Sequence, residues 1–143
     1  MKQRATLICA AAFLGMIDAL YLTLMRGLHV PCSVSGGCNE VLTSPYAEVF
    51  GVPLSAIGLA FYFTVFVLAV LEIFEVARMV QWIFWLALPG FLITLVLLYL
   101  QAFVIHHFCQ YCLASATLVT IIFLTSAWPQ KPRANRKSAS QPL

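Results

Sequence analysis

The chain has 143 residues, of which 62% are hydrophobic and only 9% are charged, and its mean hydropathy is +0.95. Five acidic and eight basic residues are too few to cover a water-soluble domain of this size, so the composition excludes an ordinary soluble protein. The formal charge of +3 does not indicate a nucleic-acid-binding protein, because the basic residues cluster near the two termini and are better explained by orientation in a bilayer.

Four long apolar stretches predict the fold. A helix needs roughly 20 apolar residues to cross a hydrocarbon core of ~30 Å, and lipid excludes strands with open edges. We therefore predict an all-α membrane protein, a four-transmembrane-helix bundle that forms one domain over residues 1–128. The predicted spans are residues 5–25, 54–76, 80–103 and 109–128.

The first span follows two basic residues, Lys2 and Arg4, so a cleaved signal peptide is the alternative interpretation. The length of the apolar run, its interruption by Asp18 and the lack of a small-residue cleavage site favour a retained helix. Cys9, which is alone in this span, is interpreted as a small packing residue.

Asp18 lies near the middle of the first span, where an ionised carboxylate costs at least ~2.5 kcal/mol. We expect it to be neutral or hydrogen-bonded inside the bundle, with Tyr21 and Gln101 as candidate partners. Its role stays open between structural packing and a part in proton or substrate chemistry.

The third and fourth spans carry further features. Pro89 lies inside the third span and predicts a kink or a local break there. Trp82, Trp85 and Trp128 fall near predicted span ends, where indole rings favour the interface, so we interpret them as membrane anchors. Residues 129–143 are polar and basic and are predicted to form a disordered cytoplasmic tail on anionic lipid.

The basic residues orient the predicted bundle. An even number of spans puts both termini on one side, and the positive-inside rule makes that side cytoplasmic. Arg26 is then the one basic residue outside. The seven inside are Lys2, Arg4, Arg78, Lys131, Arg133, Arg136 and Lys137. Two segments face the exterior, namely the loop of residues 27–53 and the turn at His106 and His107.

Four of the five cysteines fall in these exterior segments as two pairs. Cys32 and Cys38 flank two serines and two glycines, which predicts a flexible loop pair. Cys109 and Cys112 form a CxxC at the mouth of the fourth span. Positions i and i+3 share a helix face, and free N–H groups at a helix N-terminus lower the pKa of a thiol. The pattern predicts dithiol–disulfide exchange in an oxidising compartment.

Other interpretations of the cysteines stay open. A four-thiolate metal site usually has two tight CxxC pairs, whereas five residues separate Cys32 from Cys38, so we predict no metal. A tetraspan scaffold stapled by two disulfides is the alternative without redox turnover. A transmembrane electron carrier would need thiols on both faces, and Cys9 is poorly placed for that. His106 and His107 are candidates for thiolate stabilisation or proton transfer, or are plain interfacial residues.

Motif order and spacing together resemble the vitamin K epoxide reductase family, specifically its bacterial members without a fused thioredoxin domain. The resemblance covers nearly the whole span region, and the combination is more specific than any single motif. It is carried by GMIDALYLT at residues 15–23, the pair Cys32 and Cys38, Ser44 six residues later, FGVPLSAIG at 50–58 and CQYC at 109–112.

The resemblance implies a four-helix bundle around a quinone, either ubiquinone or menaquinone. Cys112 is then the thiol that reacts with the quinone, and Cys109 is its partner. Cys38 passes electrons to Cys109, and Cys32 receives them from an outside thiol protein. Ser44 would cap the quinone pocket, ahead of a half-helix lying on the membrane over residues 45–52.

The same resemblance implies the cellular setting. The partner would be a separate thioredoxin-like, DsbA-type dithiol protein, and the location a bacterial inner (cytoplasmic) membrane. The reaction would reoxidise that partner and so form disulfide bonds.

Two positions depart from the animal enzymes of the family. Those enzymes have a tyrosine four residues after the second CxxC cysteine, where this chain has Ala116. They also have an asparagine near the start of the second helix, where this chain has Leu54 and Ser55. These differences favour a plain quinone over an epoxide as the acceptor.

Overall fold

The computed structural model describes residues 2–26, 28, 37–75 and 79–129, and it confirms the predicted fold class. Within these residues, four helical segments are long and apolar enough to cross a membrane. They are α1 (Lys2–Leu24), α3 (Leu54–Ile73), α4 (Val80–Tyr99) with its π-helical continuation η2 (Leu100–Ile105), and α5 (Gln110–Ala127). Cys32, Arg78 and nearly all of the predicted tail lie outside the described residues, so the predictions made for them stay predictions.

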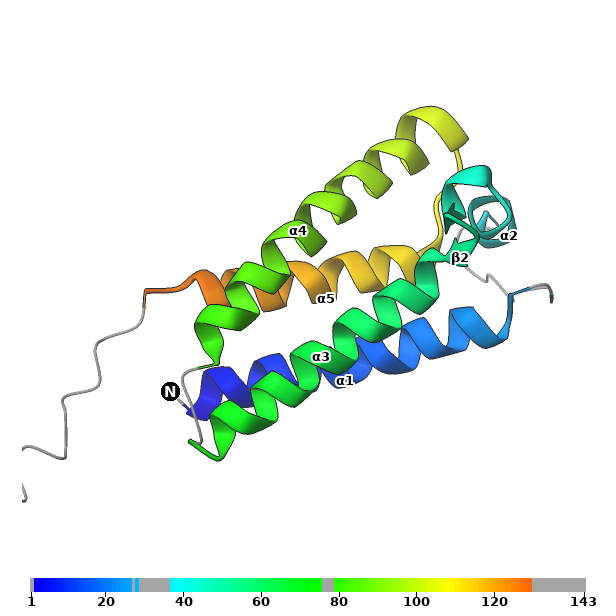
Figure 1. The fold of residues 1–143 in the computed structure, drawn as a ribbon. Helices are drawn as coiled ribbons and strands as arrows, with labels where there is room; N and C mark the ends of the chain where they lie inside the picture. Colours follow the sequence, from blue (N-terminus) through cyan, green and yellow to red (C-terminus); the bar gives the residue numbers. More distant parts are fainter. Residues whose placement is uncertain (1, 27, 29–36, 76–78, 130–143) are drawn as a thin grey trace, which may run out of the picture.

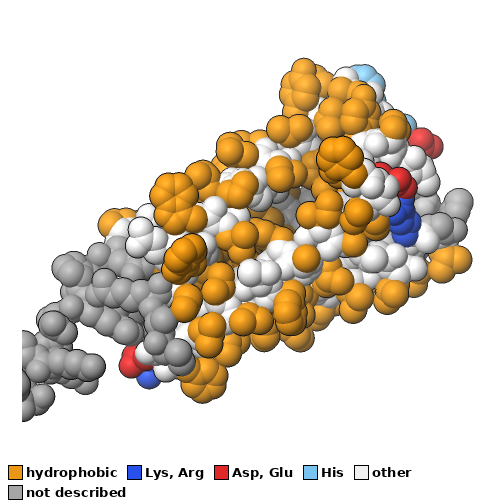
Figure 2. Space-filling view, viewed as in Figure 1, with side chains coloured by type: hydrophobic (Ala, Val, Ile, Leu, Met, Phe, Trp, Pro, Cys, Tyr) orange, Lys and Arg blue, Asp and Glu red, His pale blue; other side chains and the backbone are white. Residues whose placement is uncertain are grey.

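The four long helices alternate in direction along one axis (Figure 1). The start of α1 and the end of α5 lie at one end of the bundle. The short helix α2 (Cys38–Leu42) and the strands β1 (Glu48–Val49) and β2 (Val52–Pro53) lie at the other end. Large apolar side chains stay exposed along the helix flanks (Figure 2), as they must in a multi-pass membrane protein whose solvent is lipid.

Small residues let α1, α3 and α5 pack closely. Gly15 on α1 lies under the ring of Tyr62 on α3, where an added Cβ would be 2.3 Å from Tyr62 Cε1. Tyr62 is 1% exposed, and its hydroxyl donates to the carbonyl oxygen of Ser115 on α5 at 2.9 Å. Close contacts and interhelical hydrogen bonds of this kind hold helices together in lipid, where no hydrophobic drive brings them together.

Helix α4 joins this core near its start, through Ile83 and Ala87, and diverges from α3 toward the end that carries α2 (Figure 1). It continues through Pro89 to Tyr99, so the predicted local break does not occur at the proline. The departure from α-helical geometry comes later, in η2, where the turn widens to a π-helix. Gln101 within η2 faces the interior and is 3% exposed.

The predicted half-helix over residues 45–52 is wrong. Pro45–Ala47 form a single 3₁₀ turn (η1), and β1 and β2 pair as an antiparallel hairpin with Val49 opposite Val52. The two connecting residues, Phe50 and Gly51, have φ values of 52° and 81°. Positive φ at both positions is what a two-residue type I′ hairpin needs, and a helix cannot pass through it.

Candidate redox site

The CxxC lies where η2 ends and α5 begins. Cys109 is the N-cap of α5 with extended backbone, and its Sγ accepts the N–H of Cys112 at 3.4 Å. This corrects the expectation that both cysteines share a helix face, because Cys109 precedes the first helical residue. The side-chain hydrogen bond from Cys112 lowers the pKa of the Cys109 thiol to about 7, although desolvation by burial opposes the shift. The Cys112 thiol, with smaller contributions from backbone N–H groups at the start of α5, therefore stabilises a thiolate at Cys109.

Cys109 packs against the loop cysteine Cys38, the first residue of α2. Both side chains are fully buried and belong to the same cluster. Gly37 allows this approach, because a Cβ at Gly37 would lie 2.7 Å from His107 Cβ and 3.1 Å from the carbonyl oxygen of Phe108. The sequence suggested flexibility as the role of this glycine, whereas the structure uses it for close packing of two segments far apart in the chain.

The cysteines differ in state. Cys38 is disulfide-bonded, whereas Cys9, Cys109 and Cys112 are free thiols. Cys32, the predicted partner of Cys38, lies outside the described residues. Cys9 packs half-buried against the core of the bundle, in agreement with its interpretation as a packing residue.

A cavity of about 500 Å³ lies between α1, α3, α4 and α5, next to the CxxC. Cys112 is on its wall, whereas the residues that line it do not include Cys109. Ser44 also lines it, at the end where the hairpin lies. A recess is visible on the surface between α4 and α3 (Figure 2). The two cysteines of the motif thus border different surroundings.

The cavity suits a small, mostly apolar molecule. Its volume lies in the range of small-molecule sites, and its wall is mostly apolar with a few polar groups. Ala116, Leu54 and Ser55, the positions at which the chain departs from the animal enzymes, all line it. The departures therefore change the wall of the cavity itself.

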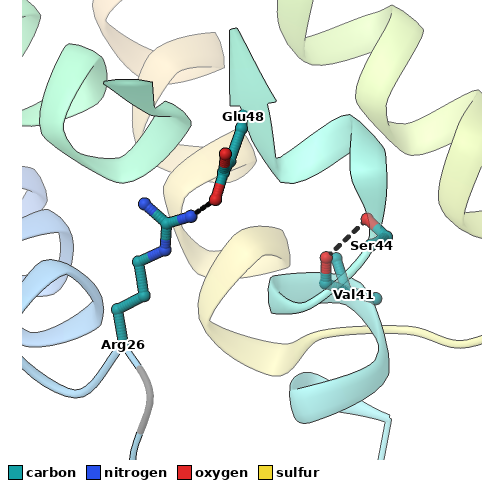
Figure 3. Close-up of polar contacts among 4 residues, drawn as sticks. All are labelled: Arg26, Val41, Ser44 and Glu48. Carbon is teal, nitrogen blue, oxygen red and sulfur yellow. Dashed lines mark hydrogen bonds and ion pairs between the residues drawn. The ribbon is translucent and has the colours of Figure 1, made fainter. Parts of the chain in front are cut away.

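Two polar contacts involve residues of the cavity wall (Figure 3). The hydroxyl of Ser44 donates to the carbonyl oxygen of Val41 at 2.7 Å, which fixes the segment after α2. Arg26, just beyond α1, forms an ion pair with Glu48 on β1 and lines the cavity. The pair ties the hairpin to α1, and its partial exposure keeps its contribution below about 1 kcal/mol.

Asp18 also lines the cavity, and its Oδ2 is buried without a hydrogen-bond partner among the described residues. The two candidate partners named from the sequence make other contacts. Tyr21 packs on the ring of Tyr111 with centroids 5.3 Å apart, and Gln101 accepts a hydrogen bond from the backbone of Cys109.

Gln101 is a site residue whose role sequence reasoning missed. Its Oε1 accepts the N–H of Cys109 at 3.2 Å, in a buried contact that joins η2 to the N-cap of α5. The contact satisfies a backbone donor that would otherwise be buried without a partner. The signal in the sequence was a polar amide eight residues before Cys109 in an otherwise apolar span.

The two histidines before the CxxC, His106 and His107, are exposed. Within the part of the chain that the structure describes, no group of three or more His, Cys, Asp or Glu side chains could hold a metal ion. The polar side-chain groups at the site are thiols, one carboxyl group, one guanidinium group, one amide and several hydroxyls.

Comparison with known proteins identifies the family. The model of the vitamin K epoxide reductase family matches residues 6–127, which include α1 from its fifth residue onward, the other three long helices, Cys38, the CxxC and the cavity. The thiol-disulfide oxidoreductase LTO1 of Arabidopsis thaliana is 48% identical over 50 residues. Those residues are 33% of this chain and only 13% of that protein, so the similarity covers a small part of the relative. From the match over most of its length, the chain belongs to the vitamin K epoxide reductase family.

Proposed function

We propose that the chain is a membrane oxidoreductase that exchanges thiols with disulfides and passes the electrons to a quinone. Electrons would move from a separate thioredoxin-like, DsbA-type dithiol protein to Cys32 and Cys38, then to Cys109 and Cys112, and then to ubiquinone or menaquinone. One observation carries the proposal: Cys109 packs against Cys38 on one side, and Cys112 lines the cavity on the other.

Cys38 links the two cysteine pairs. As a thiolate it attacks the sulfur of Cys109 in a Cys109–Cys112 disulfide, so the Cys38–Cys109 bond forms and Cys112 leaves as a thiolate. Cys32 then attacks Cys38, the Cys32–Cys38 bond forms, and Cys109 leaves. Because the hydrogen bond from Cys112 lowers the pKa of Cys109 to about 7, Cys109 is a good leaving group.

Cys112 and the cavity wall would hold the quinone. When bound, the quinone supplies the acceptor chemistry, because it takes two electrons and two protons to become a quinol. Cys112 presents its thiol to the cavity, and Cys109 lies close enough to close a disulfide with it. Ser44 and Arg26, which is paired with Glu48, belong to the cavity wall near the hairpin, where they would help to retain the ring.

The orientation is part of the proposal. Lys2 and Arg4 lie at the end of the bundle opposite the CxxC. With the termini in the cytoplasm, the cysteines lie on the extracytoplasmic side of a bacterial inner membrane. Disulfides form and persist in that compartment, which supports oxidation of the partner protein as the direction of the reaction.

The test uses the purified full chain in lipid nanodiscs, with a reduced thioredoxin-like dithiol protein and a short-tailed quinone. We expect quinone reduction in step with oxidation of the donor. Cys112→Ala should reduce no quinone and should accumulate a disulfide-linked complex with the donor. Cys9→Ala is the matched control and should keep full activity. Quinone turnover by Cys112→Ala at the wild-type rate would refute the assignment.

A disulfide-stapled or metal-binding tetraspan scaffold is the second candidate. The position of Cys112 on the wall of the cavity favours a redox dithiol over a second static bridge. Mass spectrometry after alkylation separates the two functions. In an oxidoreductase, quinone converts this thiol pair to a disulfide. In a scaffold the pair does not respond to quinone, and in a metal protein a chelator releases the metal.

A further inference from the structure

The carboxyl group of Asp18 is unusual in its surroundings. Asp18 lies on the wall of the cavity, inside a membrane-spanning helix, and its Oδ2 is buried without a hydrogen-bond partner among the described residues. Buried polar atoms are almost always paired, so an unpaired one needs an explanation. Ionisable residues inside membrane spans are rare and often belong to substrate or proton pathways.

Several other polar groups of the wall are already hydrogen-bonded within the protein. Ser44, Thr64 and Thr94 donate to backbone carbonyl oxygens of their own segments, and Tyr62 pairs with Ser115. Asp18 is the one carboxyl group among the described residues that line the cavity. A molecule in the cavity therefore has one carboxyl group on the wall around it.

Asp18 also lies near the reacting thiols. Cys112 and Tyr62 line the same cavity as Asp18, and both residues and Cys109 are within electrostatic range of its carboxyl group. The basic residue on the cavity wall, Arg26, is held by Glu48. The carboxyl group thus lies within electrostatic reach of the dithiol, while the cation on the cavity wall is held by another acid.

We propose that Asp18 is a catalytic proton carrier that gives its carboxyl proton to an oxygen of the quinone in the cavity. This inference rests on the proposed function. Counted from the neutral dithiol, both S–H bonds of Cys109 and Cys112 break, one S–S bond forms, and two electrons pass to the ring. Asp18 gives one proton to a ring oxygen and takes up one thiol proton in return. The other thiol proton goes to the second ring oxygen.

The first test compares Asp18→Asn with wild type in a single turnover, starting from the reduced dithiol and excess short-tailed quinone. Asparagine keeps the shape of the side chain and removes the acidic carboxyl proton. We expect quinone reduction to slow by about 10²-fold or more, a typical loss for a missing general acid. Binding of the quinone, followed by quenching of tryptophan fluorescence, should stay within about threefold of wild type, because the carboxyl group acts in the reaction step.

Two results would overturn the role of Asp18. One is quinone reduction by Asp18→Asn within about threefold of the wild-type rate. The other is a loss of quinone binding as large as the loss of rate, which would make Asp18 a packing or binding residue. Cys9→Ala, on the same helix and outside the cavity, is the control and should match wild type in both measurements.

The second test needs no variant. Asp18 is the single aspartate in the sequence, so protein grown with carboxyl-¹³C aspartate carries its label at that position. Infrared difference spectra of the quinone-loaded protein should show a labelled carboxylic-acid band that changes when the dithiol reduces the quinone. A labelled band that stays constant would overturn the proposal, even if Asp18→Asn failed to fold.

The two proposals fail in different ways. If the wild-type protein reduces no quinone, the proposed function is wrong. If the wild-type protein reduces quinone while Asp18→Asn does so equally well, the proposed function stands and the role of Asp18 alone is wrong.

Discussion

Cys109 and Cys112 are three residues apart, yet they occupy different environments. Cys109 is fully buried against Cys38, and Cys112 borders the cavity between the helices. The difference arises at the first turn of α5, because Cys109 is an extended N-cap while Cys112 is already helical. A dithiol at the start of a helix can therefore contact a protein thiol on one side and a small molecule on the other without a large movement of the backbone.

The largest expected effect concerns the pKa of the Cys109 thiol, which depends on the neighbouring thiol of Cys112. In wild type, the fraction of Cys109 present as thiolate should rise as the pH increases through about 7, because the hydrogen bond from the Cys112 side chain favours the charged form. Cys112→Ala removes the thiol that makes this side-chain hydrogen bond and keeps the backbone N–H. The pKa of Cys109 should therefore return toward 9.0. Its reactivity toward iodoacetamide at pH 7 should then fall more than tenfold.

Reactivity measured across a pH series checks this prediction, with Cys9→Ala as the control that keeps the wild-type profile. An unchanged profile in Cys112→Ala would mean that the start of α5, rather than the neighbouring thiol, sets the pKa of Cys109.

The second prediction removes the contact that holds Cys109 in place. Gln101→Leu leaves the buried N–H of Cys109 without its acceptor, so the free energy of unfolding should fall by about 1–3 kcal/mol. Thermal unfolding in detergent measures the loss. Gln101→Glu keeps an acceptor oxygen and should lose less. Equal stability of Gln101→Leu and wild type would remove the assigned positioning role of this amide.

The third prediction concerns the side of Cys109 that faces Cys38. Gly37→Ala puts a Cβ 2.7 Å from His107 Cβ, so the segment before α2 and the segment before α5 must move apart. This movement should lower the free energy of unfolding by about 1–3 kcal/mol. In a Cys112→Ala background, we expect the Cys38–Cys109 disulfide to form more slowly. Mass spectrometry measures the rate at which it forms. Gly58→Ala is the control, since a Cβ at Gly58 meets nothing within 4 Å. Equal rates in both variants would contradict close packing as the role of Gly37.

The smallest expected effect is at the cavity wall near the hairpin. Glu48→Gln breaks the ion pair with Arg26, and because both side chains are partly exposed, the loss should stay below about 1 kcal/mol. High salt should reduce it further by screening. Unfolding temperatures at low and high salt measure this loss of stability. Glu40→Gln, at another exposed glutamate, is the matched control. A salt-independent loss above that size would show a larger role for the hairpin.

The sequence by itself determined the helices. The predicted starts at residues 54 and 80 agree with the first residues of α3 and α4, Leu54 and Val80. Apolar runs of spanning length are a strong local signal, because lipid leaves a helix as the way to satisfy every backbone group. The order of Cys38 and the CxxC was equally plain from the chain, and together with the motifs around them it was enough to indicate the family.

Only the tertiary structure decided how the site is assembled. The hairpin at Phe50 and Gly51, the close packing of Gly37 and the hydrogen bond from Cys109 to Gln101 did not follow from the sequence. The first depends on positive backbone φ angles, which helical periodicity does not encode. The other two depend on contacts between segments that meet only after the helices pack. The same reason explains why Cys109 contacts Cys38 while Cys112 lines the cavity. The surroundings of each sulfur are set by how the helices pack.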